Sequence, residues 1–258
     1  LREMLKLRVE LVKLGGRQGM CPPLRRRRAQ AIAGQVSTRG ARPRGRRNST
    51  HTWLADRPVL AGWKVRYYGE PVVAVVGVTA LDAAKAAQAM RVVYEPLPVV
   101  NSVVDAMKPG ATLVHDDLDS YIRIKPVVRP RQGTNISHHQ SIRKGDIQRG
   151  WLECDKVIEA SYSLPQSDHV AMETRSARAE LTPDGRVMVY SSSQGPFIIR
   201  KNINRYFGVD KHKIIVITPV AGGSFGGKQS VQLELIAFLA SRAVGGRMVQ
   251  VVATREQD

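Results

Sequence analysis

The stretch of this sequence best suited to bind a ligand through its backbone is residues 221–228, Ala-Gly-Gly-Ser-Phe-Gly-Gly-Lys. It holds four glycines and one large aromatic residue, Phe225. A β-prone run at 214–218 precedes it and a helix-prone run at 231–243 follows it. A glycine loop between a strand and a helix can present backbone N–H groups to an anionic or oxo-bearing ligand. The alternative is a flexible turn without a ligand.

The glycine loop departs from the phosphate-binding loop of nucleotide-binding proteins. Residues 222–228 reproduce the spacing G-x-x-x-x-G-K, but Gln229 stands where a serine or threonine hydroxyl would hold Mg²⁺. Phe225 is also an unusual residue inside such a loop. No G-x-G-x-x-G follows the first β-prone run, so a dinucleotide fold is not indicated either.

Three further residues could do chemistry. His169 and Glu173 lie four positions apart, and on a helix they would share a face as metal ligands or as an acid–base pair. No third ligand is near, so a buried polar contact that fixes a loop is the favoured interpretation of the pair. Gln194 ends a serine-rich, strand-like run, and its amide can donate to an oxo group and accept from a donor.

The positive charge of the chain is concentrated at one end. The net charge is +18 over 258 residues, and residues 1–50 contribute +12 of it. The arginine-rich stretches at 25–28 and 39–47 lack apolar periodicity and are predicted to be disordered alone. They could form a nucleic-acid-binding segment, but no aromatic residue interleaves the arginines, so base stacking is not supported.

The two cysteines and the apolar content bound the class of protein. Cys21 and Cys154 are too far apart to suggest a metal site or a disulfide framework, so reduced thiols and a cytoplasmic location are expected. Hydrophobic residues make up 43% of the chain, which suits a globular core. No apolar run reaches the roughly 18 residues that a membrane span needs, and no secretory signal is recognised at residue 1.

The first half of the chain predicts a strand, a helix and a second strand. Residues 65–78 are β-prone, 81–90 are alanine-rich and helix-prone, and 91–95 return to β. Thr79 and Asp82 have the spacing of a helix cap. Together these elements resemble a βαβ unit. Upstream, the spacing of apolar residues in 1–14 favours a basic amphipathic helix.

The second half mixes helices and strands. A short helix is expected at 147–154 and a half-buried strand at 156–164, because apolar and polar residues alternate there. Strands at 177–181 and 187–192 are joined by the turn Thr-Pro-Asp-Gly. A helix at 196–207 should end at Gly208. A strand at 213–219, the helix after the glycine loop and a strand at 248–253 complete the order.

Eight short segments together resemble one family, the molybdenum-binding large subunit of the xanthine dehydrogenase and aldehyde oxidase family of molybdenum hydroxylases. Each segment is a weak signal alone, but their order and spacing agree with the family from about residue 57 onward. The segments are 57–61, 65–72, 94–98, 145–146, 169–174, 192–196, 222–228 and 254–256.

The resemblance implies an α+β fold in several parts. Residues 57–120 would form an α/β hammerhead domain and 121–142 a linker. Residues 143–258 would be the first part of a molybdopterin-binding domain of mixed sheets and helices, truncated here. Residues 1–50 do not resemble the strand-rich start of the hammerhead domain, and residues 1–56 are expected to be a basic, disordered segment.

The resemblance also implies roles for individual residues. Gln194 would sit by an oxo ligand of molybdenum, and Gly223, Phe225 and Gly226 would border the cofactor through the backbone. No residue of the chain would ligate the metal directly. Gln229 would face the substrate, but purine-oxidising members often carry a glutamate there, so purine specificity is in doubt. Ser224 replaces a common third glycine of the loop.

The implied activity is hydroxylation of a purine, another N-heterocycle or an aldehyde with oxygen from water. The cofactor would be molybdenum–molybdopterin, expected in its cytosine dinucleotide form. Cysteine clusters and a dinucleotide fingerprint are missing from the sequence, so iron–sulfur centres and FAD are expected on partner subunits. The glutamate base of the family is expected beyond residue 258. The chain alone is therefore expected to be inactive, and the alternative is a basic nucleic-acid-binding α/β protein that uses residues 1–50.

Overall fold

The computed structural model describes most of the chain after residue 56. It describes the backbone of residues 7–12 and 29–33, and residues 57–61, 64–92, 94, 96–116, 118–123, 127–165 and 167–258. The arginine-rich stretches at 25–28 and 39–47, and Cys21, lie outside the described residues.

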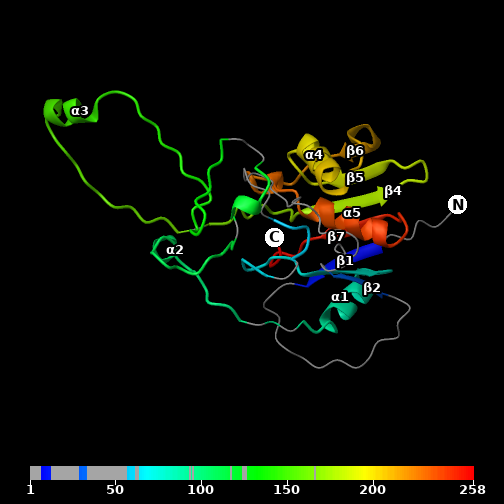
Figure 1. The fold of residues 1–258 in the computed structure, drawn as a ribbon. Helices are drawn as coiled ribbons and strands as arrows, with labels where there is room; N and C mark the ends of the chain where they lie inside the picture. Colours follow the sequence, from blue (N-terminus) through cyan, green and yellow to red (C-terminus); the bar gives the residue numbers. More distant parts are fainter. Residues whose placement is uncertain are drawn as a thin grey trace.

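The described part contains seven strands, which belong to one sheet, and five α-helices (Figure 1). The strands are β1 (Leu7–Val12), β2 (Ala29–Ala33), β3 (Val73–Gly77), β4 (Ser176–Leu181), β5 (Val187–Ser191), β6 (Ile214–Ile217) and β7 (Val249–Val252). The helices are α1 (Ala80–Gln88), α2 (Val103–Ala106), α3 (Ile147–Glu153), α4 (Pro196–Phe207) and α5 (Leu233–Ala243), with short 3-10 turns η2 (Leu118–Ser120), η3 (Lys211–Lys213) and η4 (Gly227–Gln229).

The sheet is mixed and open. Its strand order is β2-β3-β1-β7-β4-β5-β6. The pairs β1–β7 and β5–β6 are parallel, and the other four pairs are antiparallel. Strands from the first 77 residues therefore continue directly into strands from residues 176–252. The predicted hammerhead and molybdopterin-binding ranges share this sheet, and the domain boundaries stay a prediction.

The main core lies between the sheet and helices α4 and α5. Phe238 of α5 and Ile199 of α4 are buried there with Val189 and Val249 of the sheet. On β3, Ala74 and Val76 join this core, whereas the alternate residues of the strand are buried outside it. Because successive side chains of a strand point to opposite faces, α1, which packs against β1 and β3, covers the other face of the sheet.

Several local predictions are confirmed because their signals are short-range. The Thr79 side chain accepts a hydrogen bond from the backbone N–H of Asp82, which caps α1. The Thr-Pro-Asp-Gly turn joins β4 and β5 as a hairpin, closed by a bond from the N–H of Thr182 to the carbonyl of Arg186 at 2.8 Å. Helix α4 begins at Pro196 and ends before Gly208.

Three predicted elements are wrong. Residues 7–12 form strand β1 and not part of a helix, because pairing with β3 and β7 overrides a helical pattern of apolar residues. The described residues of 91–95 form no strand, so the βαβ unit is absent and β3 pairs with β1 and β2 instead. Residues 156–164 are extended and exposed but form no strand, since none of the described strands pairs with them.

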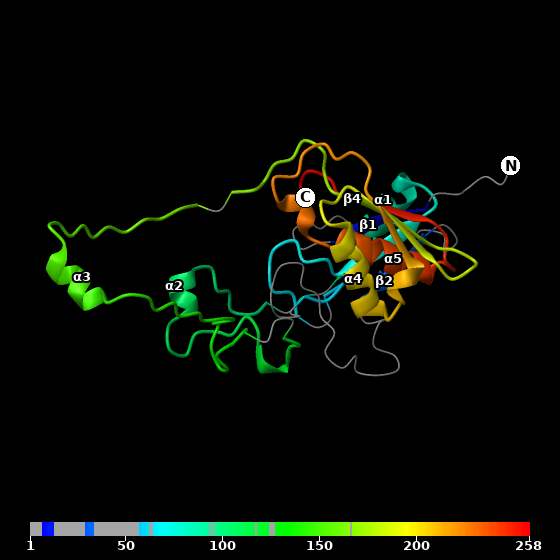
Figure 2. The same ribbon diagram turned by 90° about the horizontal axis from the view of Figure 1, so that it is seen from above.

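Two segments leave the body of the molecule (Figures 1 and 2). Residues around α2 form a loop-rich excursion, and α3 lies at the tip of a long extended one. None of the helices in the described part of the chain is both long and apolar enough to cross a membrane.

Candidate functional site

The glycine loop connects β6 to α5 beside the end of β5. Three residues have left-handed backbone conformations, with φ of +90° at Gly223, +51° at Phe225 and +96° at Gly226. For Phe225 this conformation is strained, since an L side chain rarely adopts it. The loop is therefore held in a defined conformation by its surroundings.

The backbone N–H groups at the centre of the loop are not used inside the protein. Within the described residues, the N–H groups of Gly223, Ser224, Phe225 and Gly226 donate no hydrogen bond. The flanking N–H groups are used, since that of Gly222 donates to Glu173 and that of Gly227 to the carbonyl of Ser224. Four consecutive donors are thus left available to a ligand or solvent.

Glu173 and Lys228 clamp the loop to the preceding segment. The ammonium of Lys228 lies 2.7 Å from a carboxylate oxygen of Glu173, and the Lys228 side chain is only 2% exposed. The same carboxylate oxygen accepts from the N–H of Gly222, and the N–H of Glu173 donates to the carbonyl of Gly222 at 3.3 Å. The hydrogen bond from Lys228 holds the pKa of Glu173 below its ordinary value.

Two glycines allow the two segments to approach this closely. A Cβ atom at Gly222 would lie 2.8 Å from the Cβ of Glu173, and one at Gly227 would lie 3.0 Å from the His169 ring. His169 and Glu173 are not on a helix. Glu173 makes polar contacts that fix the loop, but the predicted burial of the pair is wrong, since the side chains of Glu173 and His169 are 38% and 48% exposed. His169 packs against the same loop.

Gln194 reaches the glycine loop through the backbone. Its N–H donates to the carbonyl of Lys228 at 3.1 Å, and the hydroxyl of Ser193 donates to the same carbonyl at 3.0 Å. The Gln194 side chain is exposed. Lys228 therefore joins the end of β5 to the loop through its carbonyl, and it joins residue 173 through its side chain.

Phe225 and Gln229, which precede and follow Gly226 in the sequence, differ in their exposure to solvent. The Phe225 side chain is 75% exposed, whereas Gln229 is half-buried in η4. The structure thus brings together the glycine loop and Gln194, which are predicted from separate parts of the sequence.

An open cavity of about 370 Å³ lies against the loop. Gly226 is the one predicted cofactor-binding residue that lines this cavity, and His169, which precedes Glu173 in the sequence, also lines it. The other lining residues are Asp168, Val170, Ala171, Arg175, Ser224, Gly227, Lys228, Ser230 and Asp258. The predicted residues Gln194, Gly223, Phe225 and Gln229 are not among the residues that line it.

Two arginine side chains hold residues that line this cavity. Arg175 pairs with Asp258, with 2.6 Å between Nε and the carboxylate oxygen, and also donates to the hydroxyl of Ser230. Arg255 donates to the carbonyls of Ala171 and Met172 at 2.6 and 2.8 Å. These bonds hold residues 171–175 in place beside the glycine loop.

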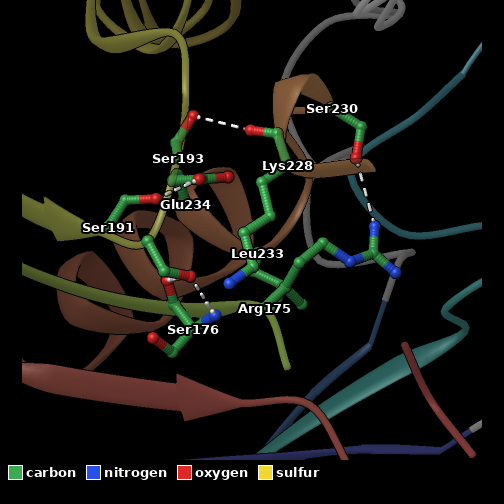
Figure 3. Close-up of a pocket in the computed structure, with 9 residues that line it drawn as sticks. Arg175, Ser176, Ser191, Ser193, Lys228, Ser230, Leu233 and Glu234 are labelled. Carbon is green, nitrogen blue, oxygen red and sulfur yellow. Dashed lines mark hydrogen bonds between the residues drawn. The ribbon is translucent and has the colours of Figure 1, made fainter. Parts of the chain in front are cut away.

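A buried polar cluster lies next to the glycine loop and includes Lys228 at the end of the loop (Figure 3). Its small cavity, of about 10 Å³, has room for about one water molecule. It is lined by Arg175, Ser176, Ser191, Ser192, Ser193, Lys228, Ser230, Leu233 and Glu234. In Figure 3 the hydroxyl of Ser191 donates to the carboxylate of Glu234 at the start of α5.

Sequence reasoning missed Lys228, Arg175 and Glu234. The signal for Glu234 is visible in the sequence, since it is the single charged residue in the apolar run 233–240. Glu234 is only 4% exposed, and burial raises the pKa of its carboxyl. No sequence signal pairs Lys228 with Glu173 or Arg175 with Asp258.

Replacing Glu234 by glutamine should stabilise the protein at neutral and higher pH. A raised pKa means that the folded state favours the protonated carboxyl, so its stability contribution is lost as the pH rises through the folded pKa. Glutamine removes the free-energy cost of holding a charged carboxylate out of water, and its amide oxygen can still accept a hydrogen bond from Ser191. Urea unfolding should show a gain on the order of 1 kcal/mol at high pH that vanishes in acid. A loss of stability at every pH would contradict the expectation.

Comparison with known proteins identifies the family. Residues 128–258 match the family model of the molybdopterin cofactor-binding domain. The chain belongs to this family. The matched range contains the glycine loop, Gln194 and the segment that holds Glu173, so the geometry described above lies inside the molybdopterin cofactor-binding domain.

Relatives of known description match 79% of the chain. A protein of Bacillus subtilis described as a probable xanthine dehydrogenase subunit is 31% identical over 204 residues, which are 79% of this chain and 25% of that protein. The xanthine dehydrogenase molybdenum-binding subunit of Escherichia coli O157:H7 is 29% identical over 203 residues, again 79% and 25%. The chain spans about a quarter of the length of these relatives.

Solved structures share the fold. Carbon monoxide dehydrogenase from Oligotropha carboxidovorans superposes with a TM-score of 0.78 at 21% identity, over 100% of this chain and 32% of that chain. Aldehyde oxidoreductase from Desulfovibrio gigas gives 0.74 at 20% identity, over 98% and 27%. The open mixed α/β sheet is thus shared with these proteins. The nucleic-acid-binding alternative gains no support from the comparisons.

Proposed function

We propose that this chain forms one wall of a molybdenum–molybdopterin site in an oxidoreductase of the xanthine dehydrogenase and aldehyde oxidase type. The observation that carries the proposal is the run of four unused N–H donors at residues 223–226. Membership of the molybdopterin cofactor-binding domain family supports the identity of the ligand.

The donor set fits such a group. Successive N–H groups in a loop of alternating backbone handedness form a concave surface that favours anions and oxo groups. The handedness alternates over residues 223–225, since Gly223 and Phe225 are left-handed and Ser224 between them is not, and Gly226 continues the left-handed conformation. We assign these three residues to the cofactor side, and we assign to the Gln194 amide a hydrogen bond to an oxo group.

The chemistry divides between the cofactor and the chain. When bound, the cofactor supplies the two-electron oxidation that transfers water-derived oxygen to a purine, another N-heterocycle or an aldehyde. The chain positions the reacting groups through preorganised backbone donors, whose strained conformation is held by Glu173 and Lys228. We place Gln229 on the substrate side, where its amide can hydrogen-bond a substrate but cannot titrate.

The remaining parts of the assembly belong to the same proposal. The cofactor is in its cytosine dinucleotide form, and iron–sulfur and FAD centres lie on partner subunits. The general base comes from polypeptide outside these 258 residues, in keeping with the quarter length that the chain spans. Residues 57–120 correspond to the hammerhead domain. Cys154 is an exposed free thiol, which suits a cytoplasmic location.

Nuclear magnetic resonance can test the ligand site without any turnover. In a ¹⁵N-labelled chain, the amide signals of residues 223–226 should shift when sodium molybdate is added. They should shift further with the pterin cofactor released from a purified xanthine dehydrogenase. The physical reason is that these four consecutive donors have no acceptor among the described residues and are therefore available to an anionic or oxo-bearing ligand.

The control is an exposed glycine of similar backbone conformation. Gly110 also has a positive φ, +73°, but nothing lies within 4 Å of the position of its missing Cβ. Its amide should therefore show no response. If neither probe shifts the signals of residues 223–226 more than that of Gly110, the proposal is wrong.

A further inference from the structure

Residues 142–165, here called the arm, extend away from the body of the molecule. Figures 1 and 2 both show the arm as a long excursion with α3 at its tip. Every residue of the arm is exposed. Such length and exposure would be unexceptional for a polar linker, but the arm is rich in large apolar side chains.

The distal part of the arm has the sequence pattern of a strand without a partner. Ile158, Ala160, Tyr162 and Leu164 alternate with polar residues at every second position, so in an extended chain they share one face. The side chains of Ile158, Tyr162 and Leu164 are 80%, 88% and 90% exposed. Within the described residues, 155–165 make no hydrogen bond.

Helix α3 adds a second apolar surface at the tip. Its start is well formed, since the Asp146 side chain accepts from the N–H groups of the first turn. Ile147 and Trp151 lie four residues apart and share a face, and they are 66% and 56% exposed. The arm therefore presents a built helix and an extended segment, and the apolar faces of both are uncovered.

We propose that the arm docks by strand addition onto a sheet edge in the part of the molybdenum-containing subunit that this chain does not span. The proposal rests on the proposed function for the identity of that partner. The relatives are about four times as long as the region matched here, so they contain further polypeptide that could supply such an edge. Residues 156–164 would supply backbone bonds, and the apolar alternate side chains would supply the burial.

The edge strands of the sheet in the described part of this chain are too short to pair with the whole extended segment of the arm. The terminal strands of the sheet are β2 and β6. They contain five and four residues, whereas the extended segment 156–164 of the arm contains nine. A second copy of the chain would therefore pair only about half of it. Two arms that paired with each other would form an isolated two-stranded ribbon, which is marginally stable in water.

Co-expression can test this docking. The probe is the part of the Bacillus subtilis relative that lies outside the 204 matched residues, expressed as a separate polypeptide with a tag. Hydrogen–deuterium exchange is then compared in the chain alone and in the purified complex. We expect peptides within 155–165 to exchange at least about tenfold more slowly in the complex, because strand pairing protects amides.

Matched variants distinguish a docked strand from a loose contact. Replacing Ile158 and Tyr162 together by lysine places two charges on the apolar face and should reduce the co-purified polypeptide at least about tenfold. Replacing Ser161 and Ser163 by lysine places the same charges on the opposite face and should change the yield less than about twofold. Circular dichroism on the chain alone checks that the body folds in both variants.

Three outcomes would overturn the proposal. These are no complex with the unmodified chain, a complex in which residues 155–165 stay unprotected, and equal loss in both lysine pairs. A dimer of the chain alone with protected 156–164 would assign the arm to a second copy instead. None of these measurements uses the cofactor. A complex that protects the arm while residues 223–226 ignore both ligand probes would therefore contradict only the proposed function.

Discussion

Replacing Glu173 by glutamine should lower the free energy of unfolding by about 2–4 kcal/mol at about pH 7. The change leaves the ammonium of Lys228 buried, 2% exposed, without its carboxylate partner. Removing one partner of a buried ion pair is costly because the remaining charge stays out of water. Glu173 itself is 38% exposed, so the loss should fall below that of a fully buried pair.

The expected loss depends on pH with a definite sign. The pKa of Glu173 is lowered in the folded protein, so its contribution is present above the unfolded pKa and is lost as the pH falls through the folded pKa. The difference between the variant and the original protein in urea unfolding should therefore shrink in acid. Loss of the contact between residue 173 and Lys228 should also make the glycine loop more mobile, which would appear as faster amide exchange at residues 222–228.

A surface ion pair provides the control. Glu153 pairs with Arg149 at 2.6 Å on α3, with both side chains more than half exposed. Replacing Glu153 by glutamine should cost no more than about 0.5 kcal/mol, because exposed pairs contribute little. Equal effects of the two substitutions would show that Lys228 is not held as a buried charge, and the described role of Glu173 would be wrong.

Replacing Gly246 by alanine should destabilise the fold by about 3 kcal/mol. Gly246 follows the end of α5 with φ of +83°, and its N–H donates to the carbonyl of Ser241 in the last turn of the helix at 2.8 Å. Its own carbonyl accepts from the N–H of Leu181 at 3.0 Å, which joins the helix end to β4. A Cβ there would lie 2.7 Å from the carbonyl oxygen of Leu181, so the backbone of one of the two segments would have to move.

Gly245 serves as the control that distinguishes the cost of a left-handed backbone from the cost of a steric clash. Gly245 has a similar φ of +75°, but nothing lies within 4 Å of the position of its missing Cβ. Its replacement by alanine should therefore cost only the left-handed conformation, about 1 kcal/mol. Thermal or urea unfolding of both variants measures the difference. If the two alanine variants were equally stable, the close contact between residues 246 and 181 would not exist.

Elements defined by short-range chemistry could be predicted from the sequence. The cap at Thr79, the β4–β5 hairpin, α4 and the glycine loop each depend on residues within a few positions of one another. Elements that form only by pairing with a strand distant in the sequence could not be predicted. Residues 7–12 form a strand because β3 and β7 flank them, whereas none of the described strands pairs with residues 156–164.

The candidate site shows the same division. By itself, the sequence determined that residues 221–228 form a glycine loop between a strand and a helix, and that Gln194 lies between another strand and helix α4, although β5 ends at Ser191 and not at Gln194. Only the tertiary structure decided that Lys228, buried beneath the loop, joins Gln194 to Glu173. The physical reason is that residues 55 positions apart meet through sheet pairing and packing, whereas spacing along the chain reports only local geometry.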